Sequence, residues 1–384
     1  MSGAVSPLTD LRGEFPAARL NARRVASMVE APNCVRRTIL DSAGVDTSLL
    51  VKKLGFKSDR QSPLAISRGA QFEALLARDG RAQLVQLARR HLGLELTDVR
   101  EKDLSPGATR DQVRVPADIR RAKMTRQELN RILRKDPNAL NLLVKPLTTL
   151  TIGELEAQLE QDVLAFAEKG SLHVVAIRNF YLKRDDADPT LVGKAARESA
   201  VHVLSLQRMA EEMGFSADQV STKVLLILPR DLLFIPAGIV LDVSNEVQHL
   251  ADAIDRVGNI EELAESLDLP PLPALPVDLQ TDPDDEVLQN GIRETLSALP
   301  MRFGDGCVSC ALFRPCRDEA DASRSTARMG SAVSALCGDD ASVDELLDLA
   351  EGRREPQGPS ESALSTILRR ANAAVVRAQT AGAA

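Results

Sequence analysis

The chain has 384 residues, an apolar fraction of 44% and a formal net charge of −7, and it contains no tryptophan. This length allows two or three domains, and the core must be built from aliphatic residues because aromatic residues make up only 3%. No run of eighteen apolar residues occurs, so we expect no membrane span. The N-terminal residues also lack the apolar region of a secretory signal, so we expect a cytoplasmic protein.

Charge is distributed unevenly along the chain. Residues 1–135 hold 26 Lys and Arg against 15 Asp and Glu, whereas the remaining residues hold 22 against 40. The most basic segment is 110–135, which includes Arg120, Arg121 and Lys123. A local basic patch can bind a polyanion whatever the net charge, so this segment is the candidate DNA-binding surface. The alternative is a solvated helix face.

Helical spacing of apolar residues dominates the first part of the chain. It predicts a short helix after Cys34 and a single helix over 67–93 that starts at a Ser N-cap and ends at Gly93. The basic segment is also predicted to be helical. Residues 138–158 contain Pro146 and few helix signals beyond the sequence GELEAQ.

Two pairs of β-runs follow, separated by a long predicted helix over 189–214. The first pair, 162–167 and 172–182, is joined by EKGS, which is typical of a hairpin turn. The second pair covers 222–230 and 232–243. This order predicts an α/β protein with a mixed central sheet flanked by helices. No glycine-rich phosphate motif follows a strand, so a dinucleotide or ATP site is not supported.

Composition divides the chain into four segments. A helical region over 245–268 is followed by a Pro-rich stretch, and the residues after 352 resemble a linker. We expect an N-terminal segment (1–60), an α/β core (61–265), a Pro-rich linker with a three-cysteine loop (266–320), and a helical, partly disordered C-terminal tail (321–384).

Three of the five cysteines, Cys307, Cys310 and Cys316, have the spacing C-x2-C-x5-C. In a reducing cytoplasm such a group indicates a metal or cluster site rather than disulfides. A tetrahedral or cuboidal site needs a fourth ligand, for which Cys34 and Cys337 are the candidates. Cys34 precedes a predicted helix, where a thiolate can be presented outward. Cys337 ends an apolar helix and is more simply a buried small residue.

The first predicted hairpin carries the residues expected of a phosphodiester hydrolase. Asp162 opens its first strand, and Glu73, in a preceding helix, can supply a second carboxylate. Hard oxygen ligands of this kind bind Mg2+ or Mn2+. Each residue also has a simpler interpretation, Glu73 as an ordinary helix carboxylate and Asp162 as a turn residue.

These features resemble the RecB-type branch of the PD-(D/E)xK nucleases, which includes the iron–sulfur exonucleases of CRISPR adaptation and the nuclease domain of AddB. The resemblance covers roughly residues 30–320 and rests on Cys34, on the RGxxFE sequence with Glu73, on the Asp162 hairpin and on the late cysteine triplet. It implies a restriction-endonuclease-like fold. It also implies a [4Fe–4S] cluster, held by Cys34 and the three late cysteines, that joins the chain ends; zinc is the alternative.

The sequence departs from this family at the second strand of the hairpin. Ala176 and Arg178 stand where the family has (D/E)-x-K, and Glu198 and His202 stand where its next helix presents Gln and Tyr. Alanine cannot ligate a metal, and arginine cannot accept a proton although it can hold a phosphate. Glu198 could replace the missing carboxylate if its helix face looks onto the hairpin. Otherwise Glu198 and His202 are ordinary helix residues.

The resemblance therefore implies a nucleic-acid-binding, nuclease-like protein of DNA repair, recombination or phage defence with weak or no cleavage. Its site would comprise Glu73, Asp162, Arg178 and Glu198, with Mg2+ or Mn2+ as the metal. DNA, as a single strand or a duplex end, is the expected ligand. The sequence contains no helicase motif, so any unwinding must come from another protein, and a helicase is therefore a candidate partner. The alternatives are an active exonuclease that uses Glu198 and a zinc-stapled scaffold protein.

Overall fold

The computed structural model describes most of the chain in two compact units, which we treat separately. Unit 1 comprises Met1–Pro16, Glu30–Ser58 and Ala264–Ala384, and unit 2 comprises Ala17–Val29 and Asp59–Leu263. The described residues are 6–18, 20–28, 34–56, 63–96, 98–105, 117–152, 155–166, 170–183, 186–230, 234–256, 258–275, 285–304, 306–307, 310–338 and 341–381.

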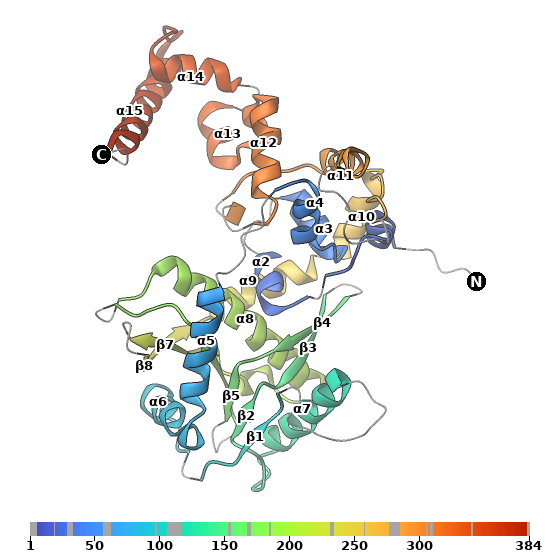
Figure 1. The fold of residues 1–384 in the computed structure, drawn as a ribbon, viewed down its shortest axis with the longest axis vertical. Coiled ribbons are helices and arrows are strands. Elements are labelled where there is room, and N and C mark those ends of the chain that lie inside the picture. The colour runs from blue at the N-terminus through green and yellow to red at the C-terminus, as the bar shows by residue number, and fades with distance from the viewer. Residues whose placement is uncertain are drawn as a thin grey trace, which may run out of the picture. The chain divides into compact units, whose positions relative to one another are not determined.

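Unit 2 is built around a mixed sheet with the strand order β1-β2-β5-β6-β7-β8 (Figure 1). The strands are β1 (Glu101–Asp103), β2 (Leu142–Val144), β5 (Val163–Phe166), β6 (Leu172–Ile177), β7 (Lys223–Arg230) and β8 (Ile235–Asp242). The pairs β1–β2 and β6–β7 are parallel, and the other neighbours are antiparallel. The predicted α/β class with a mixed sheet is confirmed. The predicted hairpin corresponds to the antiparallel strands β5 and β6, and the second predicted pair of β-runs corresponds to the antiparallel strands β7 and β8.

A second sheet in unit 2 was not predicted. It is an antiparallel hairpin of β3 (Leu147–Ile152) and β4 (Leu155–Glu160). β4 includes the last four residues of the GELEAQ stretch, which carried helix signals, and residues 153–154 lie outside the described residues. In this strand Ala157 and Leu159 are buried whereas Glu156, Gln158 and Glu160 are exposed. This alternation is the period of a half-buried strand, and it outweighs the helix propensity of Glu, Ala and Gln.

Helices α5 (Pro63–Leu76) and α6 (Ala82–Leu92) cover one face of the mixed sheet. Phe72, Leu76 and Leu84 of these helices pack in one apolar cluster with Val175 of β6 and Leu225 of β7. These apolar contacts hold the two helices against the sheet.

The prediction of one helix over 67–93 is wrong. A 3-10 turn, η1 (Asp79–Arg81), separates α5 from α6, and Asp79, Gly80 and Arg81 all have positive φ, of 51°, 58° and 60°. An Asp-Gly pair favours such a turn, because glycine adopts the left-handed conformation without steric cost.

Helix α8 (Pro189–Glu212) covers the opposite face of the sheet and confirms the long predicted helix. It starts after Asp188, whose carboxylate accepts the N–H groups of Thr190 and Leu191 and so satisfies two free donors at the helix start. Ala176 of β6 alternates with Val175, so it faces α8, and it is buried there. The other helices of this part of the chain are α2 (Ala22–Met28), α7 (Ala117–Leu133), α9 (Ser244–Asp255) and α10 (Gly258–Ser266).

Unit 1 is helical and brings together residues from both ends of the sequence. Its helices are α1 (Pro7–Arg12), α3 (Val35–Ser42), α4 (Thr47–Lys53), α11 (Glu286–Ala298), α12 (Phe313–Ser323), α13 (Ser331–Cys337), α14 (Val343–Glu351) and α15 (Pro359–Ala381). α3 confirms the short helix predicted after Cys34.

The Pro-rich stretch is packed where the structure describes it. The N–H of Leu272 donates to the carbonyl of Leu11 at 2.8 Å, and the Leu272 side chain is buried. The hydroxyl of Thr295 in α11 donates to the carbonyl of Pro271 at 3.3 Å. Residues 276–284 lie outside the described residues. No helix in the described part of the chain combines the length and apolarity needed to cross a bilayer.

Candidate functional site

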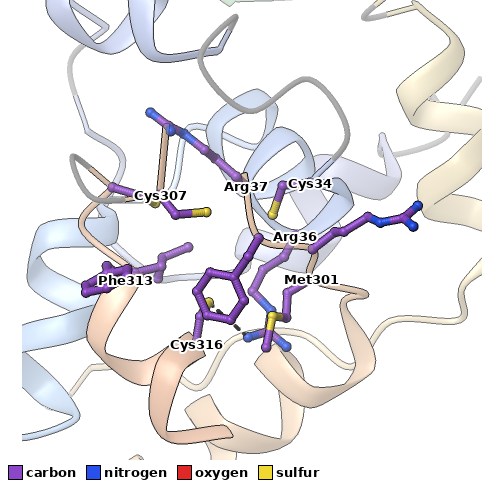
Figure 2. Close-up of a pocket in the computed structure, with 11 residues that line it drawn as sticks. Cys34, Arg36, Arg37, Met301, Cys307, Phe313 and Cys316 are labelled. Atoms are coloured by element: carbon purple, nitrogen blue, oxygen red, sulfur yellow. Dashed lines mark hydrogen bonds between the residues drawn. The ribbon is translucent and has the colours of Figure 1, made fainter. Parts of the chain in front are cut away.

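Four cysteines line one pocket in unit 1. They are Cys34, directly before α3, Cys307 and Cys310, and Cys316 in the first turn of α12. Figure 2 shows Cys34 and Cys307 directing their sulfur atoms into the same space, with Arg36 beside Cys316. The thiol of Cys34 is buried rather than presented outward. Cys337, the other candidate for a fourth ligand, lies at the end of α13 and does not line this pocket.

Short-range backbone bonds shape the late cysteine segment. The N–H of Cys310 donates to the carbonyl of Cys307 at 3.0 Å, and the N–H of Phe313 donates to the carbonyl of Cys310 at 3.1 Å. The N–H of Gly304 donates to Sγ of Cys307 at 3.3 Å. Successive tight turns therefore gather the three late cysteines at the start of α12.

Burial and two arginines have opposite effects on the thiols. Burial raises the pKa of Cys316 to about 11, although the charge of Arg36 and its hydrogen bond to the sulfur oppose the rise. Burial also raises the pKa of Cys310, opposed by the charge of Arg37. Without a bound cation these thiols are thus mainly protonated at neutral pH, and binding a metal would release their protons.

The donor set fits a thiolate-bound group in its chemistry. Four sulfur atoms, a backbone N–H on one sulfur and a guanidinium on another are the ligands and outer partners that zinc and iron–sulfur sites use. The arrangement is not a closed ligand sphere, because no three Cys, His, Asp or Glu side chains among the described residues are placed to hold a metal ion.

The second cluster of predicted site residues lies at the hairpin β5–β6 in unit 2. The Arg178 guanidinium lies between two carboxylates: Nη1 donates to Oδ2 of Asp162 at 2.6 Å and Nη2 donates to Oε2 of Glu198 at 2.9 Å. Oδ2 of Asp162 also accepts the N–H of Ile177 at 3.2 Å. The face of α8 that carries Glu198 therefore looks onto the hairpin. Arg178 thus bonds to both Asp162 and Glu198, so three of the four predicted site residues are in direct contact.

Glu73 occupies a neighbouring position. It is exposed on α5 and lines a pocket with Asp162, Ile177, Lys145 and Asp103. Its Oε2 lies 3.5 Å from Nζ of Lys145, which is also 3.9 Å from Oε1 of Glu160. Glu73 thus shares a pocket with Asp162, but among the described residues it pairs with Lys145 and not with Arg178.

Two residues behind this cluster are buried. Ala176 is 3% exposed, so a longer side chain there would be enclosed against α8. His202 is 7% exposed, and its Nδ1 has no hydrogen-bond partner among the described residues. Burial lowers the pKa of His202 from 6.5 to about 4; the charge of Asp162 opposes this shift, and the charge of Arg178 adds to it. His202 is therefore a neutral core residue and not a surface residue.

The basic segment is only partly a surface. Arg121 is buried: its guanidinium donates to the carbonyls of Leu104 and Lys145 at 2.7 and 3.0 Å and pairs with Glu160 at 2.6 Å. Its inclusion in a DNA-binding face is thus wrong, because it has a structural role. Residues 110–116 lie outside the described residues.

Three of the exposed cations of this region have no ion-pair partner among the described residues. Lys123, Arg134 and Lys135 are exposed, and no ion pair joins any of them to another described residue. Lys123 and Arg134 are eleven positions apart, close to three helical turns, so they lie on the same side of α7 and the turn that follows it. We name this group the α7 basic patch.

Several residues at these sites had no sequence signal. Arg36 and Arg37 follow Cys34 directly, but nothing in the sequence indicates that their side chains reach the late cysteines. Lys145 likewise is one lysine among many until the structure places it beside Glu73. These contacts join positions remote in sequence, which local patterns do not report.

No protein-family model matches this chain, and no curated protein matches it. A solved structure described as the crystal structure of SSO0001 has 15% sequence identity and covers 54% of this chain and 85% of that chain, with a TM-score of 0.16. So low a score supports no argument about fold or function.

We predict that His202 makes the protein sensitive to acid. The unfolded state binds a proton at His202 near pH 6.5, whereas the folded state binds it only near the lowered pKa. The free energy of unfolding is thus at its full value above pH 6.5. It decreases by about 3 kcal/mol as the pH falls toward 4, because the unfolded state binds the proton first. Urea unfolding at pH 7 and pH 4.5 should show a smaller pH dependence for His202→Gln. Substituting the exposed His249 should leave the dependence unchanged, and an equal effect of both substitutions would contradict the assignment.

Proposed function

We propose that this protein is a nuclease-like nucleic-acid-binding protein of DNA repair, recombination or phage defence that binds its ligand without cleaving it efficiently. The observation that carries the proposal is the guanidinium of Arg178 between Asp162 and Glu198. A divalent cation in a phosphodiester hydrolase needs such converging carboxylate oxygens. Here both carboxylates are already paired with one cationic side chain of the protein itself.

The geometry of this bridge makes it a strong competitor for a metal ion. Both bonds are short and charge-assisted, and each uses a different nitrogen of one planar group, which adds directional specificity. The Arg178 side chain is 23% exposed, so water screens the pairs only in part. A metal ion would have to displace the guanidinium before it could use either carboxylate.

The fold supports the nuclease-like part of the proposal. The antiparallel strands β2, β5 and β6 are followed by helix α8, which crosses over to the parallel strand β7. Asp162 stands directly before β5, at the end of the sheet where the pocket with Glu73 opens. We infer a restriction-endonuclease-like core for unit 2 from this order and from the position of the carboxylates.

The α7 basic patch supports the nucleic-acid-binding part. Its three cations are exposed and have no described ion-pair partner, in contrast to the paired Arg126 and Arg131 on the same helix. Unpaired surface cations attract phosphates without first breaking an internal ion pair. Single-stranded DNA or a duplex end remains the proposed ligand, with a helicase or another protein as the partner.

We also propose that unit 1 holds a [4Fe–4S] cluster through Cys34, Cys307, Cys310 and Cys316, with zinc as the alternative. The common pocket and the all-sulfur donor set support this assignment. Such a group would supply folding free energy by joining α3 to the segment before α12.

The first test is the salt dependence of binding to a fluorescent single-stranded oligonucleotide. The triple variant Lys123→Gln, Arg134→Gln, Lys135→Asn should bind more weakly, and the slope of log affinity against log salt should decrease by about 2, because each phosphate contact on a single strand contributes about 0.7. The matched control substitutes Gln for Arg208, Arg324 and Arg353, which are exposed but already ion-paired. Equal binding by both triple variants would show that the patch is only a solvated face.

The second test addresses cleavage. The wild-type protein should show little Mg2+- or Mn2+-dependent cleavage, and adding Mn2+ should not raise its unfolding temperature. Arg178→Met leaves Asp162 and Glu198 without their cation, so this variant should be stabilised by Mn2+. Asp162→Asn in the Arg178→Met background should remove that stabilisation. Strong cleavage by the wild-type protein that is lost in Glu198→Gln would instead establish the active exonuclease.

The third test is metal content. Protein purified without oxygen should contain iron and sulfide, and Cys34→Ser should lose both and unfold at a lower temperature. Cys337→Ser is the matched control and should retain them. Zinc without sulfide would favour the stapled scaffold, and loss of metal in Cys337→Ser would mean that the fourth ligand was assigned wrongly.

A further inference from the structure

Arg36 is the most deeply buried arginine beside the cysteine pocket, and its side chain is 1% exposed. Its guanidinium makes three contacts within unit 1. Nε donates to the carbonyl of Leu299 at 3.0 Å, and Nη1 lies 2.7 Å from Oε2 of Glu319. Nη1 also donates to Sγ of Cys316 at 3.3 Å (Figure 2).

The contact with sulfur distinguishes Arg36 from an ordinary structural arginine. A neutral thiol is a weak acceptor, whereas a thiolate is an anion and forms a charge-assisted bond with a guanidinium. The one carboxylate that Arg36 contacts, Glu319, also pairs with Arg328. Glu319 is therefore shared between two cations, so a thiolate at Cys316 would complete the charge balance of the buried guanidinium.

Arg36 also links the two segments that carry the cysteines. Its backbone N–H donates to the carbonyl of Pro300 at 2.8 Å, and its side chain reaches the neighbouring carbonyl of Leu299. Cys34 lies two residues before Arg36, and Cys316 lies at the end of its side chain. One residue thus fixes where the early cysteine stands and which way a late cysteine points.

We propose that Arg36 is a positioning residue for a thiolate-bound metal ion or iron–sulfur cluster: it holds Sγ of Cys316 by an N–H···S bond and anchors the Cys34 end of α3 against the late segment. This inference rests on the proposed cofactor site and adds the residue that orients its ligands. Residues in such a position tune the affinity of a site and the electronic properties of its sulfur ligands.

The test uses Co2+, because its thiolate charge-transfer absorption reports the sulfur ligands whichever metal the protein holds in the cell. Full-length wild-type protein, Arg36→Gln and Arg36→Lys are compared after reduction and metal removal. Arg36→Gln should bind Co2+ about 10- to 100-fold more weakly. The charge-transfer band of the bound form should also shift, because one sulfur loses its hydrogen bond. Arg36→Lys keeps the charge, so it should recover part of the affinity.

Arg121→Gln is the matched control. Arg121 is equally a buried arginine bonded to two carbonyls and a carboxylate, but it contacts no sulfur. It should lower the stability of the protein while leaving the Co2+ affinity and spectrum unchanged. Should Arg36→Gln fail to fold, the band position of Co2+ in Arg36→Lys decides the question, because a purely structural role predicts the wild-type spectrum.

Two results would overturn the inference, and they differ in what else they affect. Wild-type affinity and an unshifted band in both Arg36 variants would remove the role of Arg36 and leave the cofactor site intact. Failure of the wild-type protein to bind Co2+ through thiolates would remove the cofactor site together with the inference. Neither result bears on oligonucleotide binding by the α7 basic patch.

Discussion

The guanidinium of Arg178 sets the character of the carboxylate cluster in unit 2. It joins the residue before β5 to a residue on α8 and so holds together two elements that meet at the end of the sheet. Asp162 and Glu198 repel each other unless a cation lies between them. In this chain the cation is Arg178, which directly follows β6. The two ion pairs thus offset part of the negative charge that Asp162 and Glu198 place at this end of the sheet.

Much of the fold follows from periodicity in the sequence. The helix over 189–214 and the two pairs of strands are long or strongly patterned, so their type was predicted correctly. The errors have local causes. The break at Gly80 depends on three residues with positive φ, and β4 alternates polar and apolar residues drawn from good helix formers. In both places the helix propensity of the surrounding residues hid the signal for a turn or a strand.

The candidate sites were predictable as sets of residues but not as contacts. Cysteine spacing identified the late triplet, and the structure adds that Cys34 shares its pocket. The helical position of Glu198 allowed a role beside the hairpin, but only the fold shows that its partner is Arg178. Charge density indicated the basic segment, yet it did not separate the buried Arg121 from the exposed Lys123. Burial depends on tertiary packing, which composition does not encode.

The discontinuous sequence of unit 1 has a consequence for the order of events during synthesis. Unit 2 is almost continuous in the chain, so it can fold while the ribosome is still translating the C-terminal part. Cys34 is synthesised early, and the ribosome must translate the intervening residues before Cys307 is made. At about 5 to 20 residues per second this interval lasts roughly 15 to 55 seconds. During that time the early thiol has no pocket, so the cell must keep it reduced until the last fifth of the protein is synthesised.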